Sequence, residues 1–298
     1  MSLNPRVAIP KYTGKSGLED LAELPRADLD ISNGLSSAPC LYSDRQGDVV
    51  YDYLFSPESS SNRLFVLFSG DAPRTKFTPP VFQRWRWSHF FPGHCLYVSD
   101  PTLRVSNVLG LAWYAGTQVF DPLQVISRTV ISFAKSLGVD LSNVYTYGSS
   151  GGGFAALRML TLVPEINGIC VNPQTNIVSY NNGAVGKFFN TCFGGRSRDQ
   201  MALDFPERID LISQSSMLLG RKIIYMQNLM DLHHYDDHYL PFCEALGEVP
   251  LSGVDLGGRD VCTQVSINGF RSIVFSDMGG HSKAEANSAF RCAMSSIL

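Results

Sequence analysis

The chain is a succession of short apolar runs that are separated by turn residues. Those with the length and composition of β-strands lie at 49–55, 64–69, 94–99, 144–147, 169–171, 223–226 and 272–275. The run at 64–69 is apolar at nearly every position, which is typical of a strand that is buried on both faces of a sheet. Such strands occur mainly in parallel sheets that helices cover on both sides.

Helical periodicity appears between these runs. Residues 122–137 place a row of apolar side chains close to one face of a 3.6-residue period, and Gly138 follows as a helix stop. The row consists of Val125, Ile126, Val130, Ile131, Phe133 and Ala134. Segments 154–162 and 284–297 are further helix candidates. Strands that alternate with helices predict βαβ units, and therefore an α/β fold with a mostly parallel central sheet flanked by helices on both faces.

Two segments depart from this alternation. Residues 1–45 are rich in Pro, Gly, Ser and Asp, and we expect an irregular N-terminal extension there, followed by one domain over 46–298. Between 174 and 220 no strand pattern is found, but an apolar cluster includes Phe188, Phe189 and Phe193. An insertion of this size can form a cap or lid over a site, and ordinary helical packing at the sheet edge is an equal alternative.

The composition excludes several kinds of protein. With 44% apolar and 17% charged residues over 298 positions, the chain is too apolar and too weakly charged to be disordered. A net charge of −3 offers no electrostatic footprint for nucleic acid, so we expect no nucleic-acid partner. The alternating Arg and Trp residues at 84–87 are more typical of ordinary packing than of a stacking platform for bases.

The sequence pattern also bears on location. No apolar run approaches the ~20 residues that cross a bilayer, and the first residues have no apolar signal core. The seven cysteines are scattered, odd in number and free of C-x-x-C, which predicts reduced thiols, several of them buried. We therefore expect a cytoplasmic protein without a disulfide framework or a zinc cluster, and its oligomeric state is open.

Chemistry concentrates in segment 145–157, YTYGSSGGGFAAL, between a predicted strand and a predicted helix. It contains the pattern G-x-S-x-G with Ser150 at its centre, which in this context is typical of a nucleophile elbow. The tight turn leaves no room for side chains two positions before and after the serine, where Gly148 and Gly152 stand. The helix behind Ser150 would offer free N–H groups to a developing negative charge. A glycine-rich turn without chemistry is the simpler alternative, and a phosphate cradle would need a G-K-[ST] ending.

With this elbow the chain resembles the α/β-hydrolase superfamily over about residues 45–298. In that superfamily an acid and a histidine follow the serine in chain order, each after a late strand. The resemblance implies an α/β-hydrolase fold and a triad in which Ser150 is the nucleophile. It also implies an oxyanion hole, one of whose donors is the N–H of Gly151, directly after the serine.

The acid and the histidine are assigned by their places after the late strands. Asp231 follows the strand 223–226, where the superfamily has a G-x-x-D turn, and Asn228 stands in place of the glycine. Asn tolerates the left-handed backbone that such a turn can need. Asp236 and Asp237 are rivals a few residues later. His281 follows the strand 272–275 in a loop with two glycines, and it is the only histidine after position 238.

The second oxyanion donor is expected in the loop 69–74, after the strand 64–69. Superfamily members often have His-Gly there, whereas this chain has Ser69-Gly70. Either Asp71 or Ala72 would supply the N–H, and we assign Asp71. A carboxylate beside an oxyanion is unhelpful unless it points away or pairs with Arg74.

Two further runs bear on the substrate. The run from 227 to 242 also resembles bacterial α/β-hydrolases that handle polysaccharide O-acetylation. It contains His233, His234 and His238, residue types that bind metals, but we favour solvated or packed rings, with one at the mouth of the site, and assign no metal ligand. The aromatic run 113–116 can line a sugar or acyl pocket, although buried packing is favoured.

Together these features predict a serine hydrolase that cleaves ester or thioester bonds through Ser150, His281 and Asp231 and an acyl-enzyme. The alternative is an O-acyltransferase that moves an acyl group, acetyl above all, to a carbohydrate hydroxyl with the same residues. A catalytically silent binding module with this fold is a third hypothesis. The expected partner is a small-molecule or carbohydrate ester, and we expect no cofactor.

Overall fold

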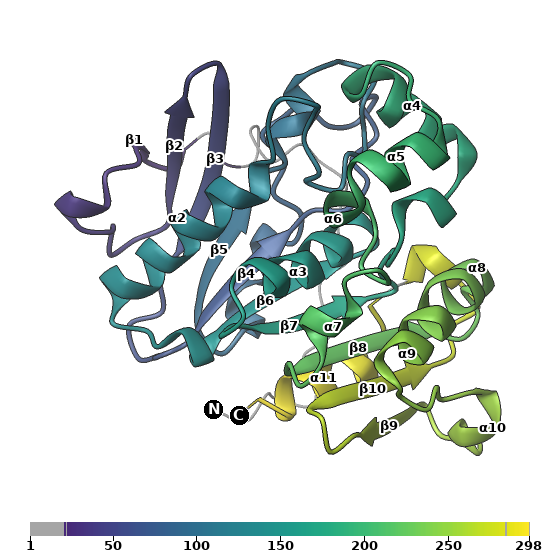
Figure 1. Cartoon of the computed structure of the whole chain (residues 1–298). Coiled ribbons are helices and arrows are strands. Elements are labelled where there is room, and N and C mark those ends of the chain that lie inside the picture. Colours follow the sequence, from purple (N-terminus) through teal and green to yellow (C-terminus); the bar gives the residue numbers. More distant parts are fainter. Residues whose placement is uncertain (1–20, 22, 284, 298) are drawn as a thin grey trace.

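The computed structural model describes residues 21, 23–283 and 285–297, and the strands within them form one mixed sheet (Figure 1). The order across the sheet is β1-β2-β3-β5-β4-β6-β7-β8-β10-β9. The strands are β1 (Arg26–Asp28), β2 (Cys40–Gln46), β3 (Val49–Ser56), β4 (Leu64–Phe68), β5 (His94–Val98), β6 (Val144–Ser149), β7 (Asn167–Val171), β8 (Ile223–Asn228), β9 (Val261–Val265) and β10 (Phe270–Phe275).

The middle of the sheet is parallel. Strands β5, β4, β6, β7, β8 and β10 pair in parallel register, whereas β3 and β9 pair antiparallel with β5 and β10. Parallel strands end at a common edge, and ligands of open α/β sheets bind beyond that edge. The residues that follow β4, β6, β7, β8 and β10 are therefore neighbours, although they are far apart in the sequence.

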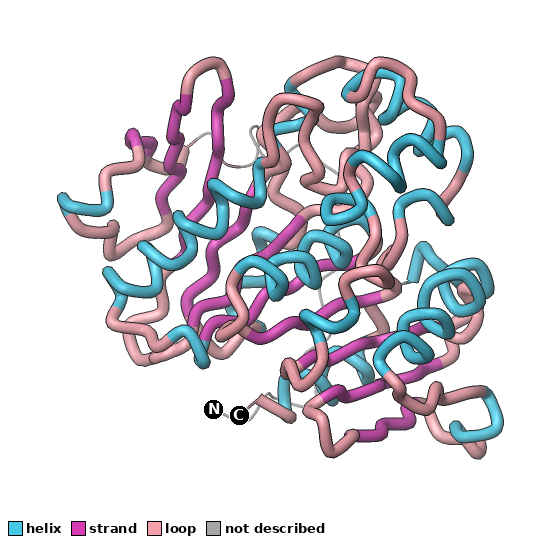
Figure 2. Tube along the Cα trace, in the orientation of Figure 1, coloured by secondary structure: helices cyan, strands magenta, loops and turns pink. Residues whose placement is uncertain are grey.

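Helices cover both faces of this sheet. On one face lie α2 (Pro122–Leu137) and α3 (Gly151–Leu162), and on the other lies α11 (Asn287–Ser295) (Figures 1 and 2). Strand β4 is apolar throughout because its side chains pack on both faces of the sheet. Val66 lies in the core of the first face and Phe65 in the core of the second. The predicted α/β class, with a mostly parallel sheet between helices, is confirmed.

The segment 174–220 is helical. It contains η5 (Ile177–Ser179), α4 (Asn182–Cys192), α5 (Arg198–Asp204), α6 (Pro206–Ile209) and α7 (Ser215–Leu218). The rings of Phe188, Phe189 and Phe193 are at most 2% exposed and contact one another edge-on or tilted. This aromatic cluster therefore belongs to the protein interior, while a lid movement of the segment stays a prediction.

The N-terminal part differs from the sequence prediction. Residues 26–28 and 40–46 form β1 and β2, so the irregular extension expected through residue 45 is wrong for these positions. The hairpin of β2 and β3 turns at Gly47, whose φ of +61° suits glycine, and the predicted domain boundary cut through it. Strand β2 was missed because its second half, Ser43–Gln46, is polar and lacks an apolar run. Residues 1–20 and 22 lie outside the described part.

Two simpler expectations can be checked against the described residues. All seven cysteines are unpaired, and five of them are buried, in agreement with the prediction of unpaired thiols of which several are buried. Within the described ranges, no helix has the length and apolar character that a membrane crossing requires.

Candidate active site

The candidate nucleophile lies at a strained turn. Ser150 joins β6 to α3 with φ +54° and ψ −124°, a backbone conformation that non-glycine residues rarely adopt and that is concentrated at functional sites. A Cβ on Gly148 would lie 2.2 Å from the carbonyl oxygen of Gly152, and a Cβ on Gly152 would lie 2.5 Å from that of Phe68. Both positions therefore require glycine, which is the steric reason that the sequence pattern implied.

The structure brings the three predicted residues into one hydrogen-bonded series. Ser150 Oγ lies 3.0 Å from His281 Nε2, and His281 Nδ1 lies 2.7 Å from Asp231 Oδ2. Ser150 and Asp231 are 7% and 6% exposed, whereas the side chain of His281 is 36% exposed. The rival acid Asp237 instead pairs with His233 at the surface, 2.7 Å away.

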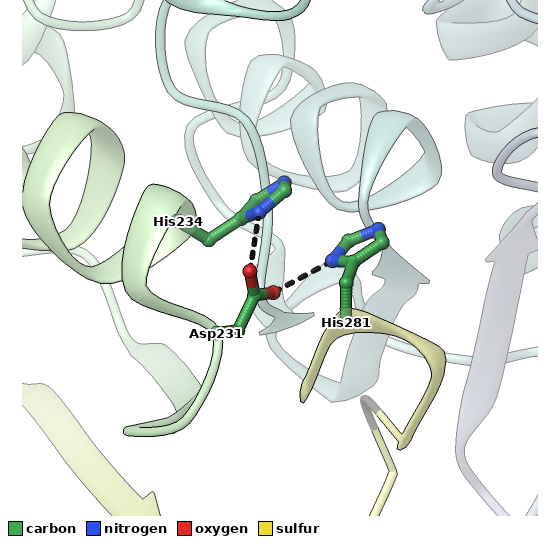
Figure 3. A group of neighbouring side chains, drawn as sticks. All are labelled: Asp231, His234 and His281. Carbon is green, nitrogen blue, oxygen red and sulfur yellow. Dashed lines mark hydrogen bonds and ion pairs between the residues drawn. The ribbon is translucent and has the colours of Figure 1, made fainter. Parts of the chain in front are cut away.

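Asp231 accepts more hydrogen bonds than its contact with His281. His234 Nδ1 lies 3.0 Å from Oδ1 (Figure 3), and the side-chain amide of Asn172 donates to Oδ2 at 2.9 Å. Desolvation alone would raise the pKa of Asp231, but the hydrogen bonds from His234 and His281 outweigh it and hold the pKa well below its ordinary value. These hydrogen bonds therefore favour the ionised form of Asp231.

The loop that carries His281 is tied to the end of β8. The amide of Asn228 donates to the carbonyl oxygens of Asp277 and Gly280, both at 2.9 Å, and its oxygen accepts the Asp277 N–H. This explains the asparagine that replaces the glycine of the superfamily turn. The Asn228 side chain joins the end of β8 to the loop that carries His281. A left-handed backbone is not the reason for this residue, because Asn228 ends β8 in extended conformation.

A buried ion pair holds the other side of the same loop. Glu285 follows the loop 276–283 and pairs with Arg84, and its Oε1 also accepts the Tyr147 hydroxyl at 2.9 Å. Arg84 donates in turn to the hydroxyl of Ser149, beside the nucleophile position. Arg84 and Trp87 are thus packed in the interior, as the packing alternative predicted, and the Trp87 ring centroid lies 5.9 Å from the Arg84 guanidinium. Arg86, by contrast, is exposed and lies over the partly buried ring of Trp85.

A residue that the sequence argument missed lies against Ser150. Gln174 is fully buried, and its Nε2 lies 3.0 Å from Ser150 Oγ and 2.6 Å from His234 Nε2. Its Oε1 accepts the indole N–H of Trp113 at 3.0 Å. Position 174 follows the end of β7, at the edge of the sheet where the other site residues lie. This place after a parallel strand is the signal by which the sequence could have pointed to Gln174. Trp113 is 1% exposed, which confirms packing as the role of the run 113–116.

The rings of His233, His234 and His238 lie together, with centroids 5.2 to 5.3 Å apart, and hydrogen bonds engage all three. His234 Nε2 is hydrogen-bonded to Gln174, and His238 Nδ1 accepts the Thr175 N–H at 3.3 Å. Burial lowers the pKa of His234 to about 4 and that of His238 to about 2. The nitrogen and oxygen atoms of Asp231, His234 and His281 lie within 4.8 Å of one another, but both imidazoles direct Nδ1 at the carboxylate in hydrogen bonds (Figure 3).

Two backbone N–H groups are available for an oxyanion. Gly151 is the first residue of α3, so its N–H has no intrahelical acceptor. In the loop after β4, the N–H of Gly70 donates to Gln83 Oε1 and the N–H of Ala72 donates to the Gly110 carbonyl oxygen, each at 2.8 Å. Among the residues that the structure describes, no acceptor takes the Asp71 N–H. Of the two predicted positions, Asp71 therefore has the N–H that remains available, while its part in an oxyanion hole stays a prediction.

The Asp71 side chain turns toward Gly110. Its Oδ1 would lie 2.9 Å from a Cβ placed on Gly110, and desolvation there raises the pKa of the carboxyl, although Asp71 as a whole is exposed. The hydrogen bonds of Arg74 run to the Leu103 carbonyl oxygen and to Asn107, so of the two arrangements considered for the Asp71 carboxylate, pairing with Arg74 is not observed.

Comparison with known proteins defines the fold. No family model and no curated protein sequence matches the chain. Among solved structures, a capsule O-acetyltransferase of Neisseria meningitidis serogroup A matches at 15% identity and a TM-score of 0.55, over 85% of this chain and 95% of that one. An acetyl xylan esterase from Aspergillus awamori matches at 14% identity and a TM-score of 0.54, over 82% of this chain and 94% of the esterase. A hormone-sensitive lipase from a metagenome library matches at 12% identity and a TM-score of 0.54, over 94% of this chain and 90% of the lipase.

The chain has the α/β-hydrolase fold. The mostly parallel sheet, the strand order and these structural neighbours agree on that fold, as the resemblance implied. The neighbours are an acetyltransferase, an esterase and a lipase. At identities this low a likeness defines the fold alone, and the function has to be argued from the site.

Proposed function

We propose that this protein is a serine-dependent acyl-transfer enzyme whose principal reaction is the hydrolysis of ester or thioester bonds. Ser150 is the nucleophile, His281 the general base, and Asp231 the carboxylate that orients and stabilises the imidazole. One observation carries the proposal. It is the hydrogen-bonded series from Ser150 Oγ through His281 to Asp231, at 3.0 and 2.7 Å, which starts from a serine at a strained elbow.

In the acylation half, His281 Nε2 takes the hydroxyl proton while Ser150 Oγ attacks the acyl carbonyl carbon. The carbonyl oxygen becomes an oxyanion that accepts from the N–H groups of Gly151 and Asp71, and each such donor contributes about 3 kcal/mol to transition-state stabilisation. When the tetrahedral intermediate collapses, Nε2 gives the proton to the departing alkoxide or thiolate. An ester on Ser150 remains.

In the deacylation half, water takes the place of the leaving group. His281 removes one proton from it, the resulting hydroxide attacks the ester carbon, and Ser150 Oγ leaves with that proton. The exposed side of His281 fits an acceptor that arrives from solvent. Asp231 stays ionised through both halves, because the hydrogen bonds that lower its pKa persist while the imidazole is charged.

A fluorophosphonate probe tests the nucleophile directly. We expect rapid labelling of the wild-type protein and none of Ser150→Ala, with the adduct on the peptide 145–157 in mass spectra. Ser213→Ala, which removes an exposed hydroxyl in the segment 174–220, is the matched control and should label like the wild type. Labelling that survives in Ser150→Ala, or an adduct outside 145–157, would refute the assignment.

Acyl transfer to a hydroxyl is a second candidate function. The observation that favours it is the match over 95% of the chain of a capsule O-acetyltransferase, a mutant of which was solved in complex with CoA. A sugar hydroxyl would then replace water in deacylation and give up its proton to His281. Acetyl-CoA or an activated acetyl ester, offered with and without oligosaccharide acceptors, separates the two reactions. Acetylated sugar supports transfer, and acetate release that acceptors leave unchanged supports hydrolysis alone.

A further inference from the structure

The amide of Gln174 has only one orientation that satisfies its partners. Its Oε1 lies 3.0 Å from Trp113 Nε1, and an indole nitrogen can only donate, so this contact identifies the oxygen end of the amide. Gln174 is 0% exposed and Trp113 is 1% exposed, so bulk water does not compete for the contact. The nitrogen end must therefore face the other two neighbours of the side chain.

Those two neighbours are both forced to accept. Gln174 Nε2 lies 3.0 Å from Ser150 Oγ and 2.6 Å from His234 Nε2, and an amide nitrogen donates two hydrogen bonds but accepts none. One N–H is thus directed at the serine oxygen and the other at the imidazole nitrogen. Each contact has a consequence for where a proton can be.

For His234, the consequence is its tautomer. Because Nε2 accepts, the ring proton is on Nδ1, which lies 3.0 Å from Asp231 Oδ1 and donates to it (Figure 3). His281 donates from its own Nδ1 to the other oxygen of the same carboxylate, at 2.7 Å. The two imidazole rings lie almost parallel, with centroids 4.1 Å apart and planes at 13°.

For Ser150, the consequence is the direction of its hydroxyl. Since Oγ accepts from Gln174, its own proton has one remaining partner in the described structure, His281 Nε2 at 3.0 Å. A second lone pair of Oγ is left free to attack an acyl carbon. Serine hydroxyls otherwise rotate among several partners, and here the amide removes that freedom.

We propose that Gln174 and His234 are positioning residues, which direct the Ser150 proton to His281 and keep a neutral imidazole beside the one that becomes charged. The inference deepens the proposed function and rests on it, because it gives these residues a part in the same proton transfer. The hydrogen-bond arrangement can nevertheless be measured in a protein that performs no reaction.

Neutrality of His234 follows from its contacts. A proton on Nε2 would face the Gln174 N–H, donor against donor, and burial independently disfavours the charged ring. Other groups around the ring are Asp231 at hydrogen-bond distance, the stacked His281, His233 and His238 with ring centroids at 5.3 and 5.2 Å, and Tyr180 at 5.7 Å. Of these, only the carboxylate favours a cation, and it already accepts the Nδ1–H. When His281 takes the serine proton, its stacked neighbour therefore adds no like charge.

Gln174→Glu tests the arrangement with a side chain of nearly the same shape. A carboxylate still accepts from Trp113, but it would also accept from His234 Nε2 and from the Ser150 hydroxyl, which reverses both constraints. In ¹⁵N NMR spectra of the full-length protein at pH 7, wild-type His234 should show a protonated Nδ1 and an unprotonated Nε2. In Gln174→Glu both of its nitrogens should be protonated. The fluorophosphonate labelling rate should fall by about 10- to 100-fold, and the KM for a small activated ester should change by less than about threefold.

Gln200→Glu is the matched control, since it makes the same change at a capping position of α5 where glutamate serves equally well. It should leave the His234 signals and the labelling rate as in the wild type. Wild-type His234 protonated at Nε2, or a Gln174→Glu rate equal to that of the wild type, would overturn the inference in a protein that labels at Ser150. If wild-type protein shows the expected tautomer but never labels, the proposed function is wrong, and the catalytic part of this inference is wrong with it.

Discussion

His281 and His234 meet one carboxylate from two sides, and the pair can be compared almost atom by atom. Each points Nδ1 at an oxygen of Asp231, at 2.7 and 3.0 Å, and the rings are stacked. They differ at Nε2, where His281 faces the hydroxyl of Ser150 and His234 faces the amide of Gln174. A hydroxyl can pass its proton to an imidazole, whereas an amide N–H keeps it. The group opposite Nε2 therefore decides which ring can act as a base.

The surroundings of the two rings reinforce this difference. The side chain of His281 is 36% exposed, in a loop held by Asn228 and Glu285, while that of His234 is 3% exposed in α8 (Leu232–His234). An exposed ring can meet a substrate and solvent, and a buried one can only hold its neighbours in place. We therefore expect the two histidines to respond very differently to the same substitution.

The largest expected difference is between His281→Ala and His234→Ala. Loss of His281 removes the base, and we expect ester hydrolysis and fluorophosphonate labelling to fall on the order of 10⁴-fold. Loss of His234 leaves Ser150 and His281 in contact but frees one Gln174 N–H and one oxygen of Asp231, for which we expect about a tenfold fall. Rates at saturating probe, measured for both variants, give the ratio.

The control is His89→Ala, which removes an exposed imidazole from η2 (Trp85–Phe90). Folding of each variant is checked by circular dichroism and by its urea unfolding midpoint. Equal losses of rate in His281→Ala and His234→Ala, with both variants folded, would contradict the division of roles between base and positioning residue.

A smaller effect is expected on the pH dependence of stability. Burial lowers the pKa of His234 to about 4 and that of His238 to about 2, whereas an unfolded chain binds these protons below about pH 6.5. The unfolded state therefore gains protons first, and the free energy of unfolding falls as the pH drops from about 6.5 toward 4. Between pH 7.5 and pH 5 each ring should contribute a loss of about 2 kcal/mol.

Urea unfolding at pH 7.5 and 5, with His234→Gln and His238→Gln, measures these contributions. Each variant should lose its share of the pH dependence, and His89→Gln controls for the loss of an exposed imidazole. Asp231 does not interfere, because its lowered pKa gives a stabilisation that is complete above about pH 5 and is lost only at lower pH. A His234→Gln or His238→Gln variant that keeps the whole pH dependence of the wild type would contradict the neutral, buried state of that ring.

The comparison also shows what could be predicted from the sequence. Ser150, Asp231 and His281 follow β6, β8 and β10, and parallel strands deliver the residues after their carboxyl ends to one edge. Chain order and local motif were therefore enough to choose residues that the structure brings together. The fold class was also predictable, because apolar runs such as β4 are long and uninterrupted.

Other features depend on contacts that no local pattern reveals. Gln174 acts through the direction of its amide, which Trp113 sets from 61 positions away in the sequence. The sequence left His234 without a role, because its residue type is visible there and its hydrogen-bond partners Asp231 and Gln174 are not. Strands β2 and β9 lie toward the edges of the sheet with several exposed side chains, so they lack the apolar runs that mark the central strands.

The smallest expected effect comes from Trp113→Phe, which removes the donor that orients Gln174 and keeps an aromatic ring at the site. The freed Oε1 is buried, and an unpaired buried acceptor costs about 1–3 kcal/mol of stability. The amide can then turn over and present its oxygen to Ser150 or to His234, so labelling should slow by about 3- to 10-fold and the single Nδ1–H tautomer of His234 should be lost from ¹⁵N spectra.

Trp85→Phe, at a partly exposed ring beneath Arg86, controls for the change of side-chain volume. A Trp113→Phe protein that is less stable but keeps the wild-type rate and tautomer would show that Trp113 only packs, and that His234 and His281 are distinguished without it.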